Sequence, residues 1–112
     1  MKSINFNNKV FYLLENSKGG KVNSETRFEY KQDGSLVTAD YFGGTIKYGK
    51  IIATLKVKKL VMLYQCVTID NELKAGKATA DITFNENDKM LLSIKWQWLD
   101  SDKSGFSEYC EI

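Results

Sequence analysis

The residues best suited to bind a small molecule are two tryptophans in the run IKWQW at 94–98. Trp96 and Trp98 stand two positions apart in a segment whose even positions from 90 to 98 are all apolar. In a β-strand this spacing puts both indoles on one face, about 7 Å apart at a rise of about 3.3 Å per residue. We expect both rings to face inward, either as core or, for Trp98 near the strand end, as the lining of a cavity.

Two neighbouring residues, Tyr64 and Gln65, are candidates for polar contacts in such a site. They lie in the segment LVMLYQCVT at 60–68, which is apolar on both faces, so the pattern does not choose its inward side. Because side chains alternate along a strand, one of the two faces the interior and can orient a ligand there. The alternative role for either is a structural hydrogen bond.

Glu108 is a third polar candidate, and its direction depends on the preceding loop. A five-residue loop at 100–104 pairs Glu108 with Trp96 and turns it inward, where a buried carboxylate has a raised pKa and often marks a site. A four-residue loop turns Ser107 and Tyr109 inward instead, and Glu108 is then an exposed residue on an edge strand.

The usual signatures of catalysis are missing from the chain. It contains no histidine, which is the commonest general base and metal ligand, and no Ser-His-Asp, GxSxG, HExxH or Walker motif. Cys66 and Cys110 are too far apart in sequence for a metal knuckle or a redox pair, and we expect two free buried thiols. We therefore expect no cofactor and no metal, and acid–base chemistry is left to carboxylates, tyrosines and lysines.

Length and composition indicate one small soluble domain spanning residues 1–112. The net charge of +2 comes from scattered lysines and a single arginine, which argues against a nucleic-acid partner. No stretch approaches the roughly 18 apolar residues of a membrane span, and the N-terminus lacks the pattern of a signal peptide. These features predict a cytoplasmic protein that interacts with neither nucleic acid nor membrane.

Turn signals recur every eight to twelve residues with no gap of helical length, which predicts an all-β antiparallel meander. A two-residue turn at Asp33-Gly34 pairs Tyr30 with Val37, and one at Gly43-Gly44 pairs Ala39 with Tyr48. Both registers give the same apolar face, and the opposite face carries a charge row.
This predicted charge row consists of Arg27, Asp40 and Lys47.

Later hairpins extend the pattern. A further turn at Gly49-Lys50 makes 45–48 a short strand, and a loop at 85–89 sets Ala78 opposite Trp96 and Gly76 opposite Trp98, small residues against large ones. The turns, which include one at 17–20, separate eight or nine strands. Closure between 9–16 and 105–111 gives an up-and-down barrel, with an open twisted sheet or sandwich as the alternative.

The chain resembles a group of small uncharacterised bacterial all-β proteins. The shared runs are ETRFEYKQDGSLVTADYFGG at 25–44, LYQ at 63–65, ELKAGK at 72–77 and KWQW at 95–98. Some members carry the label N-acetylglutamate synthase, although this sequence has no Arg/Gln-x-x-Gly-x-Gly/Ala loop capping a helix. By layout it also resembles calycins, the lipocalin, fatty-acid-binding and avidin-like barrels, and that resemblance implies a small-molecule cavity at an open end.

Three functions follow as hypotheses. The first is a non-catalytic barrel that binds a small, partly apolar molecule through Trp96, Trp98, Tyr64, Gln65 and Glu108. The second is a protein–protein or dimerisation module that uses the two-sided apolar strand 60–68, so that the protein is a monomer or a homodimer. The third is a small enzyme that uses Glu108 or Tyr64.

Overall fold

The computed structural model describes residues 4–17 and 22–112, and these form eight strands rather than nine. The segment 45–48 is not a separate strand, because no turn interrupts the chain at Gly49-Lys50. The strands are β1 (Lys9–Asn16), β2 (Arg27–Asp33), β3 (Leu36–Gly43), β4 (Ile46–Lys56), β5 (Lys59–Thr68), β6 (Leu73–Phe84), β7 (Met90–Trp98) and β8 (Ser104–Glu111).

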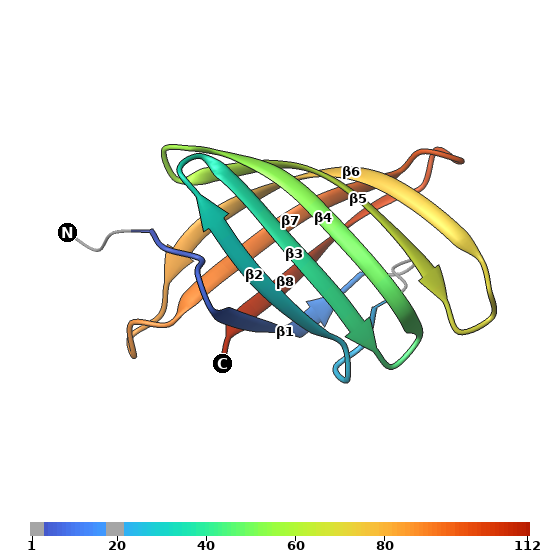
Figure 1. Ribbon diagram of the computed structural model, residues 1–112, viewed down its shortest axis with the longest axis horizontal. Helices are drawn as coiled ribbons and strands as arrows, with labels where there is room; N and C mark the ends of the chain where they lie inside the picture. The colour runs from blue at the N-terminus through green and yellow to red at the C-terminus, as the bar shows by residue number, and fades with distance from the viewer. Residues whose placement is uncertain (1–3, 18–21) are drawn as a thin grey trace.

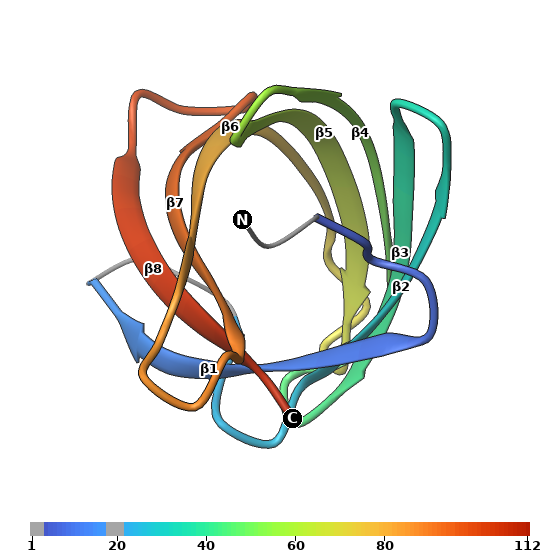
Figure 2. The same ribbon diagram turned by 90° about the vertical axis from the view of Figure 1, so that its left-hand side faces the viewer.

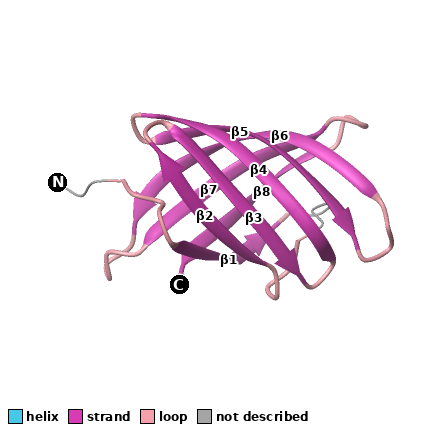
Figure 3. Cartoon of the chain, viewed as in Figure 1, coloured by secondary structure: helices cyan, strands magenta, loops and turns pink. Residues whose placement is uncertain are grey.

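Each strand pairs antiparallel with the next, and β1 pairs with β8 to close the barrel (Figures 1 and 2). The closure predicted between 9–16 and 105–111 is therefore confirmed, and the open sheet and the sandwich are wrong. Closure leaves no unpaired sheet edge. Figure 3 shows that strands and short connections make up the described chain. Among the described residues, no helix is long and apolar enough to cross a membrane.

The β2–β3 turn differs from the predicted one by one position. Its two central residues are Gly34 and Ser35, so Tyr30 pairs with Ala39 instead of Val37. Gly34 has a φ of 61°, as a two-residue turn with glycine first requires, and this turn replaces the expected Asp-Gly turn. A pair register shifted by two residues keeps every side chain on its face, so the predicted apolar face survives.

The predicted charge row is wrong. Arg27 lies opposite Phe42 and donates hydrogen bonds to backbone carbonyls, while Asp40 binds the Lys50 ammonium at 3.0 Å. The cause is the shifted turn together with an irregular register between β3 and β4, where Gly43 pairs with Ile46 but Tyr41 pairs with Gly49.

This β3–β4 irregularity also reverses Tyr48. The register of β4 against β5 shifts between Ile46 and Tyr48, so Ile46 and Ile51 both face inward although five positions separate them. Tyr48, predicted on the apolar face, is 51% exposed and donates a hydrogen bond to Asp40. A bulge in β4 thus adds one extra residue between Ile46 and Ile51, and the inward and outward directions of the side chains change there.

The β6–β7 hairpin has the predicted register throughout. Gly76 pairs with Trp98 and Ala78 with Trp96, and the loop at 85–89 connects the two strands. On β5 the inward residues are at 60, 62, 64, 66 and 68, which settles the face that the sequence left open. The turn predicted at 17–20 lies outside the described residues except for Ser17.

The two ends of the barrel differ. At one end, called the plugged end here, lie the turns at 34–35, 57–58 and 85–89, and Phe6 is fully buried against the rings of Phe11 and Tyr30. The Gln32 side chain accepts a hydrogen bond from the Phe6 amide and fixes this segment. At the other, open end lie the connections at 44–45, 69–72 and 99–103.

Candidate functional site

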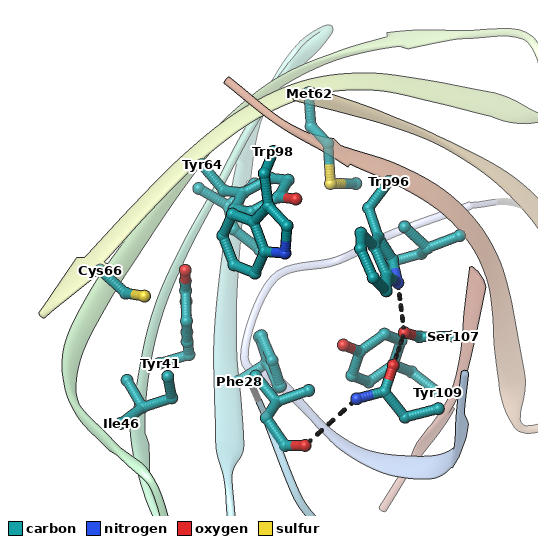
Figure 4. Close-up of a pocket in the computed structure, with 14 residues that line it drawn as sticks. Phe28, Tyr41, Ile46, Met62, Tyr64, Cys66, Trp96, Trp98, Ser107 and Tyr109 are labelled. Carbon is teal, nitrogen blue, oxygen red and sulfur yellow. Dashed lines mark hydrogen bonds between the residues drawn. The ribbon is translucent and has the colours of Figure 1, made fainter. Parts of the chain in front are cut away.

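A cavity of about 60 Å³ lies inside the barrel toward the open end. Its wall comes from the inward side chains of most strands, and Figure 4 shows these side chains converging on one space. Among the described lining residues there is no Asp, Glu, Lys or Arg. Six aromatic rings dominate the wall, namely Phe28, Tyr41, Tyr64, Trp96, Trp98 and Tyr109.

One side of the cavity is formed by three rings from β2, β3 and β8. Phe28 stacks on Tyr41 with ring centroids 4.7 Å apart, and Tyr109 meets Phe28 edge-on at 4.9 Å. The phenol of Tyr41 donates a hydrogen bond to the backbone carbonyl of Gln65 at 3.2 Å. Stacked and edge-on contacts of this kind are favourable arrangements for aromatic rings, so they stabilise this wall.

The other side is formed by rings from β5 and β7. Tyr64 meets Trp98 edge-on at 5.6 Å, and the two indoles lie 5.9 Å apart with a tilt of 54°. Both tryptophans are buried, as predicted, and both line the cavity. Their faces offer flat apolar surface to whatever enters the cavity.

A hydrogen-bonded chain of lining residues connects the Trp96 side of the cavity to β1 (Figure 4). The indole Nε1–H of Trp96 donates to Ser107 Oγ at 2.9 Å, and the Ser107 hydroxyl donates to Asn16 Oδ1. The Asn16 amide in turn donates to the carbonyl of Val22. Because buried polar groups are costly without partners, this chain keeps the orientation of Trp96 fixed.

Asn16 joins the site because of a bulge that alternation along β1 does not reveal. Phe11 and Leu13 face inward, and a strict period of two would continue with Glu15. The register with β8 shifts between Leu13 and Glu15, so Asn16 instead pairs with Ser107 and faces the cavity.

Glycines on neighbouring strands back three of the cavity rings. Gly49 pairs with Tyr41, Gly76 with Tyr64 and Gly105 with Trp96. In each pair an added β-carbon would fall within 3.0 Å of ring atoms, so the ring lies against bare backbone. Glycine inside a strand often marks such a close approach, and this signal is available from the sequence.

The tyrosines of the cavity stay uncharged at physiological pH. Burial raises the pKa of Tyr41, Tyr64 and Tyr109 above the ordinary value of 10.0. Their phenols therefore act as neutral hydrogen-bond donors and acceptors, and the cavity wall carries no negative charge.

The structure brings together three of the five predicted site residues. Trp96, Trp98 and Tyr64 line the cavity, whereas Gln65 and Glu108 are exposed on the outer surface. Gln65 does not line the cavity, because side chains alternate along β5 and Tyr64 is the residue that faces inward.

Glu108 lies outside the cavity because of the length of the loop between β7 and β8. The backbones of Trp98 and Lys103 are still hydrogen-bonded, so four residues remain in the loop. The five-residue loop that would turn Glu108 inward is therefore wrong, and the four-residue alternative is right in placing Ser107 and Tyr109 inside.

Comparison with protein families agrees with this geometry. The sequence model of the family described as avidin-like protein matches residues 4–112. The chain belongs to the avidin-like family. The avidin-like part of the calycin resemblance is thereby confirmed, and an avidin-like barrel is consistent with binding of a small ligand in its interior. No curated protein and no solved structure matches the chain.

Proposed function

We propose that this avidin-like barrel binds a small, partly apolar molecule at its open end, with an uncharged part of that molecule inside the aromatic cavity. The observation that carries the proposal is a cavity walled by six aromatic rings at the open end of an otherwise filled barrel. Small closed barrels are either filled by side chains or hold one small ligand. In this barrel, side chains fill the plugged end, and the open end contains a cavity.

The lining chemistry limits which part of a ligand enters. An ion inside the cavity would lose its hydration without an opposite charge on the described wall, and this is very unfavourable. Apolar groups gain instead, because each buried methylene contributes about 0.8 kcal/mol. The phenols of Tyr41, Tyr64 and Tyr109 supply hydrogen bonds to a neutral polar atom such as a carbonyl oxygen.

The size of the cavity limits the inserted group further. A cavity of about 150 Å³ holds a benzene molecule, whereas this one measures about 60 Å³. A short alkyl or thioether group fits without movement of the walls. The remainder of the ligand would then lie at the mouth, between the connections of the open end.

The test is a titration with straight-chain alcohols from propanol to hexanol, followed by the indole N–H signals of Trp96 and Trp98 in NMR spectra. We expect affinity to rise about fourfold per methylene until the cavity is full, which corresponds to about 0.8 kcal/mol each.

Two variants on β4 provide a matched comparison for this titration. Ile51→Phe fills the cavity from its wall and should abolish binding, whereas Ile52→Phe adds the same ring to the outer surface and should leave binding unchanged. Absence of binding by every alcohol to the unaltered protein would contradict the proposal.

A dimerisation surface is a second candidate function, favoured by the outer face of β4 and β5. Ile52 and Leu63 lie opposite each other there and are 56% and 63% exposed, and Val61 beside them is also exposed. Contiguous apolar patches of this kind often mark contacts between proteins. This outer face is distinct from the cavity, so the two functions are compatible.

Sedimentation at several concentrations tests the second candidate. We expect a self-associating species that Leu63→Lys converts to monomer, whereas Leu14→Lys, at an exposed position on β1 away from this face, leaves it intact. A monomer at every concentration would rule out self-association through this face.

A further inference from the structure

One charged side chain points toward the barrel axis at the mouth of the cavity. Lys74 lies at an inward position of β6, two residues before Gly76, and pairs across the sheet with Cys66, which lines the cavity. Its ammonium nitrogen lies 5.0 Å from the ring centroid of Trp98, a second lining residue. Lys74 therefore borders the cavity without forming part of its wall.

The ammonium of Lys74 is largely buried and is held within the protein by a long ion pair and an aromatic contact. Its side chain is only 17% exposed, and its ionic partner, the Asp100 carboxylate, is 3.4 Å away. Among the described residues its ammonium has no hydrogen bond, although it carries three N–H donors. By comparison, Lys50 and Asp40 approach to 3.0 Å in a hydrogen-bonded pair.

From this arrangement we propose that Lys74 forms an anion-binding subsite at the mouth, which takes a carboxylate or phosphate attached to the apolar group in the cavity. The proposal rests on the proposed function and adds the chemical class of the ligand: a small amphipathic anion. Its apolar end lies against the tryptophans, and its charged end lies at the rim, where water still solvates it.

The energetics favour an anionic group at Lys74 over a neutral one. Hydrogen bonds between charged partners are roughly twice as strong as those between neutral partners. The indole face of Trp98 and the barrel wall keep water from part of the ammonium, so its attraction to an anion is screened less than on an open surface.

Asp100 is the competitor for the same ammonium. It lies in the connection between β7 and β8 and its side chain is 60% exposed, so it can turn to solvent when an anion arrives. The remaining repulsion between Asp100 and the ligand weakens binding. Loss of the Asp100 charge should therefore strengthen it, which is the opposite of the effect expected at Lys74.

The experiment compares ligands with one alkyl chain and different heads: pentanol, pentylamine, pentanoate and pentyl phosphate. Binding is followed by the indole N–H signals at low and at high salt. We expect the two anions to bind at least about tenfold more tightly than the alcohol at low salt, with the advantage shrinking at high salt. The two anionic arms distinguish a carboxylate from a phosphate as the preferred head.

Substitutions at Lys74 and Asp100 test whether Lys74 is the source of a preference for anions. Lys74→Met and Lys74→Gln should remove the advantage of the anions and leave pentanol binding unchanged, and Asp100→Asn should increase that advantage. Lys77→Met is the matched control, because Lys77 lies on the same strand but on its exposed outer face.

Two results would overturn the anion subsite in different ways. Anions that bind no more tightly than pentanol, or an advantage that survives both Lys74 variants, would contradict the subsite and leave the cavity proposal standing. If none of the four compounds binds, both proposals fail.

Discussion

Gly49 on β4 lies directly against the ring of Tyr41 on β3, so closely that an added β-carbon would overlap Cζ, Cε1 and Cε2 of that ring. The pair is thus a ring laid flat on bare backbone. A ring held this way lines the cavity without filling it. The size of the cavity therefore depends on a residue that has no side chain.

The first prediction is that Gly49→Ala displaces the Tyr41 ring into the cavity. Overpacking typically costs about 1–3 kcal/mol of the free energy of unfolding, and the displaced ring should also reduce alcohol binding. The measurement is urea denaturation of the single variants and of the pair with Tyr41→Leu, since leucine lacks the overlapping atoms. The cost of Gly49→Ala should largely vanish in the Tyr41→Leu background, and an equal cost in both would refute the contact.

The second prediction concerns the chain from Trp96 to Asn16. Ser107→Ala leaves the Trp96 indole N–H and the Asn16 carbonyl oxygen without their partner, which should lower the free energy of unfolding by about 1–3 kcal/mol. The Trp96 N–H signal should also shift and broaden. Ser93→Ala, on the exposed face of β7, is the control and should change stability by less than about 0.5 kcal/mol. Equal effects of the two substitutions would show that the chain contributes nothing.

Much of the barrel can be predicted from the sequence because apolar alternation and turn residues act locally. The β6–β7 hairpin is the clearest case, since a single register sets Gly76 against Trp98 and Ala78 against Trp96, and the structure has that register. The burial of both tryptophans follows from the same alternation.

The rest of the site depends on single-residue irregularities that an alternating pattern cannot locate. The bulge after Leu13 turns Asn16 inward, and the one between Ile46 and Tyr48 turns Tyr48 outward. The loop between β7 and β8 is one residue shorter than the five-residue loop, and Ser107 therefore faces the cavity in place of Glu108. Each change reverses the direction of every later side chain in its strand, so a small error in position removes a residue from the site.

The third prediction is a loss of stability in acid through Glu111 near the plugged end. Its carboxylate accepts a hydrogen bond from the Met90 amide and pairs with Lys9 at 2.9 Å. Burial acts to raise the pKa of Glu111, but these two bonds and the positive charges of Lys9 and Lys89 outweigh it and lower the pKa below 4.5. The stabilisation is therefore present above about pH 4.5 and lost as the pH falls toward the lower folded-state value.

Replacement of the Glu111 carboxylate tests whether this residue causes the loss of stability in acid. Glu111→Gln should cost about 1 kcal/mol at neutral pH and flatten the decline in melting temperature below pH 4.5. Glu108→Gln is the matched control on the same strand, because Glu108 is exposed, and it should leave the acid profile as it was. An unaltered profile in Glu111→Gln would assign the acid sensitivity to another group.

The fourth prediction is that the buried tyrosines ionise only when the barrel unfolds. Burial raises the pKa of Tyr30, Tyr41, Tyr64 and Tyr109 above the 10.0 expected in the unfolded chain. A raised folded-state pKa gives stability that is complete below pH 10.0 and declines as the pH rises above it, because the unfolded chain then releases protons that the folded one retains.

Tyrosinate absorbance and circular dichroism, recorded together through an alkaline titration, measure this coupling. We expect the signal of these four tyrosines to appear in the same transition as the loss of β-structure, whereas in concentrated denaturant all six titrate near the ordinary pKa. Tyr109→Phe should make the alkaline loss of stability less steep by about 1.4 kcal/mol per pH unit, the slope for one proton. Ionisation of all six tyrosines while the β-signal persists would mean that water and hydroxide already reach the cavity wall in the folded barrel, and the aromatic enclosure would then be too open to desolvate a ligand.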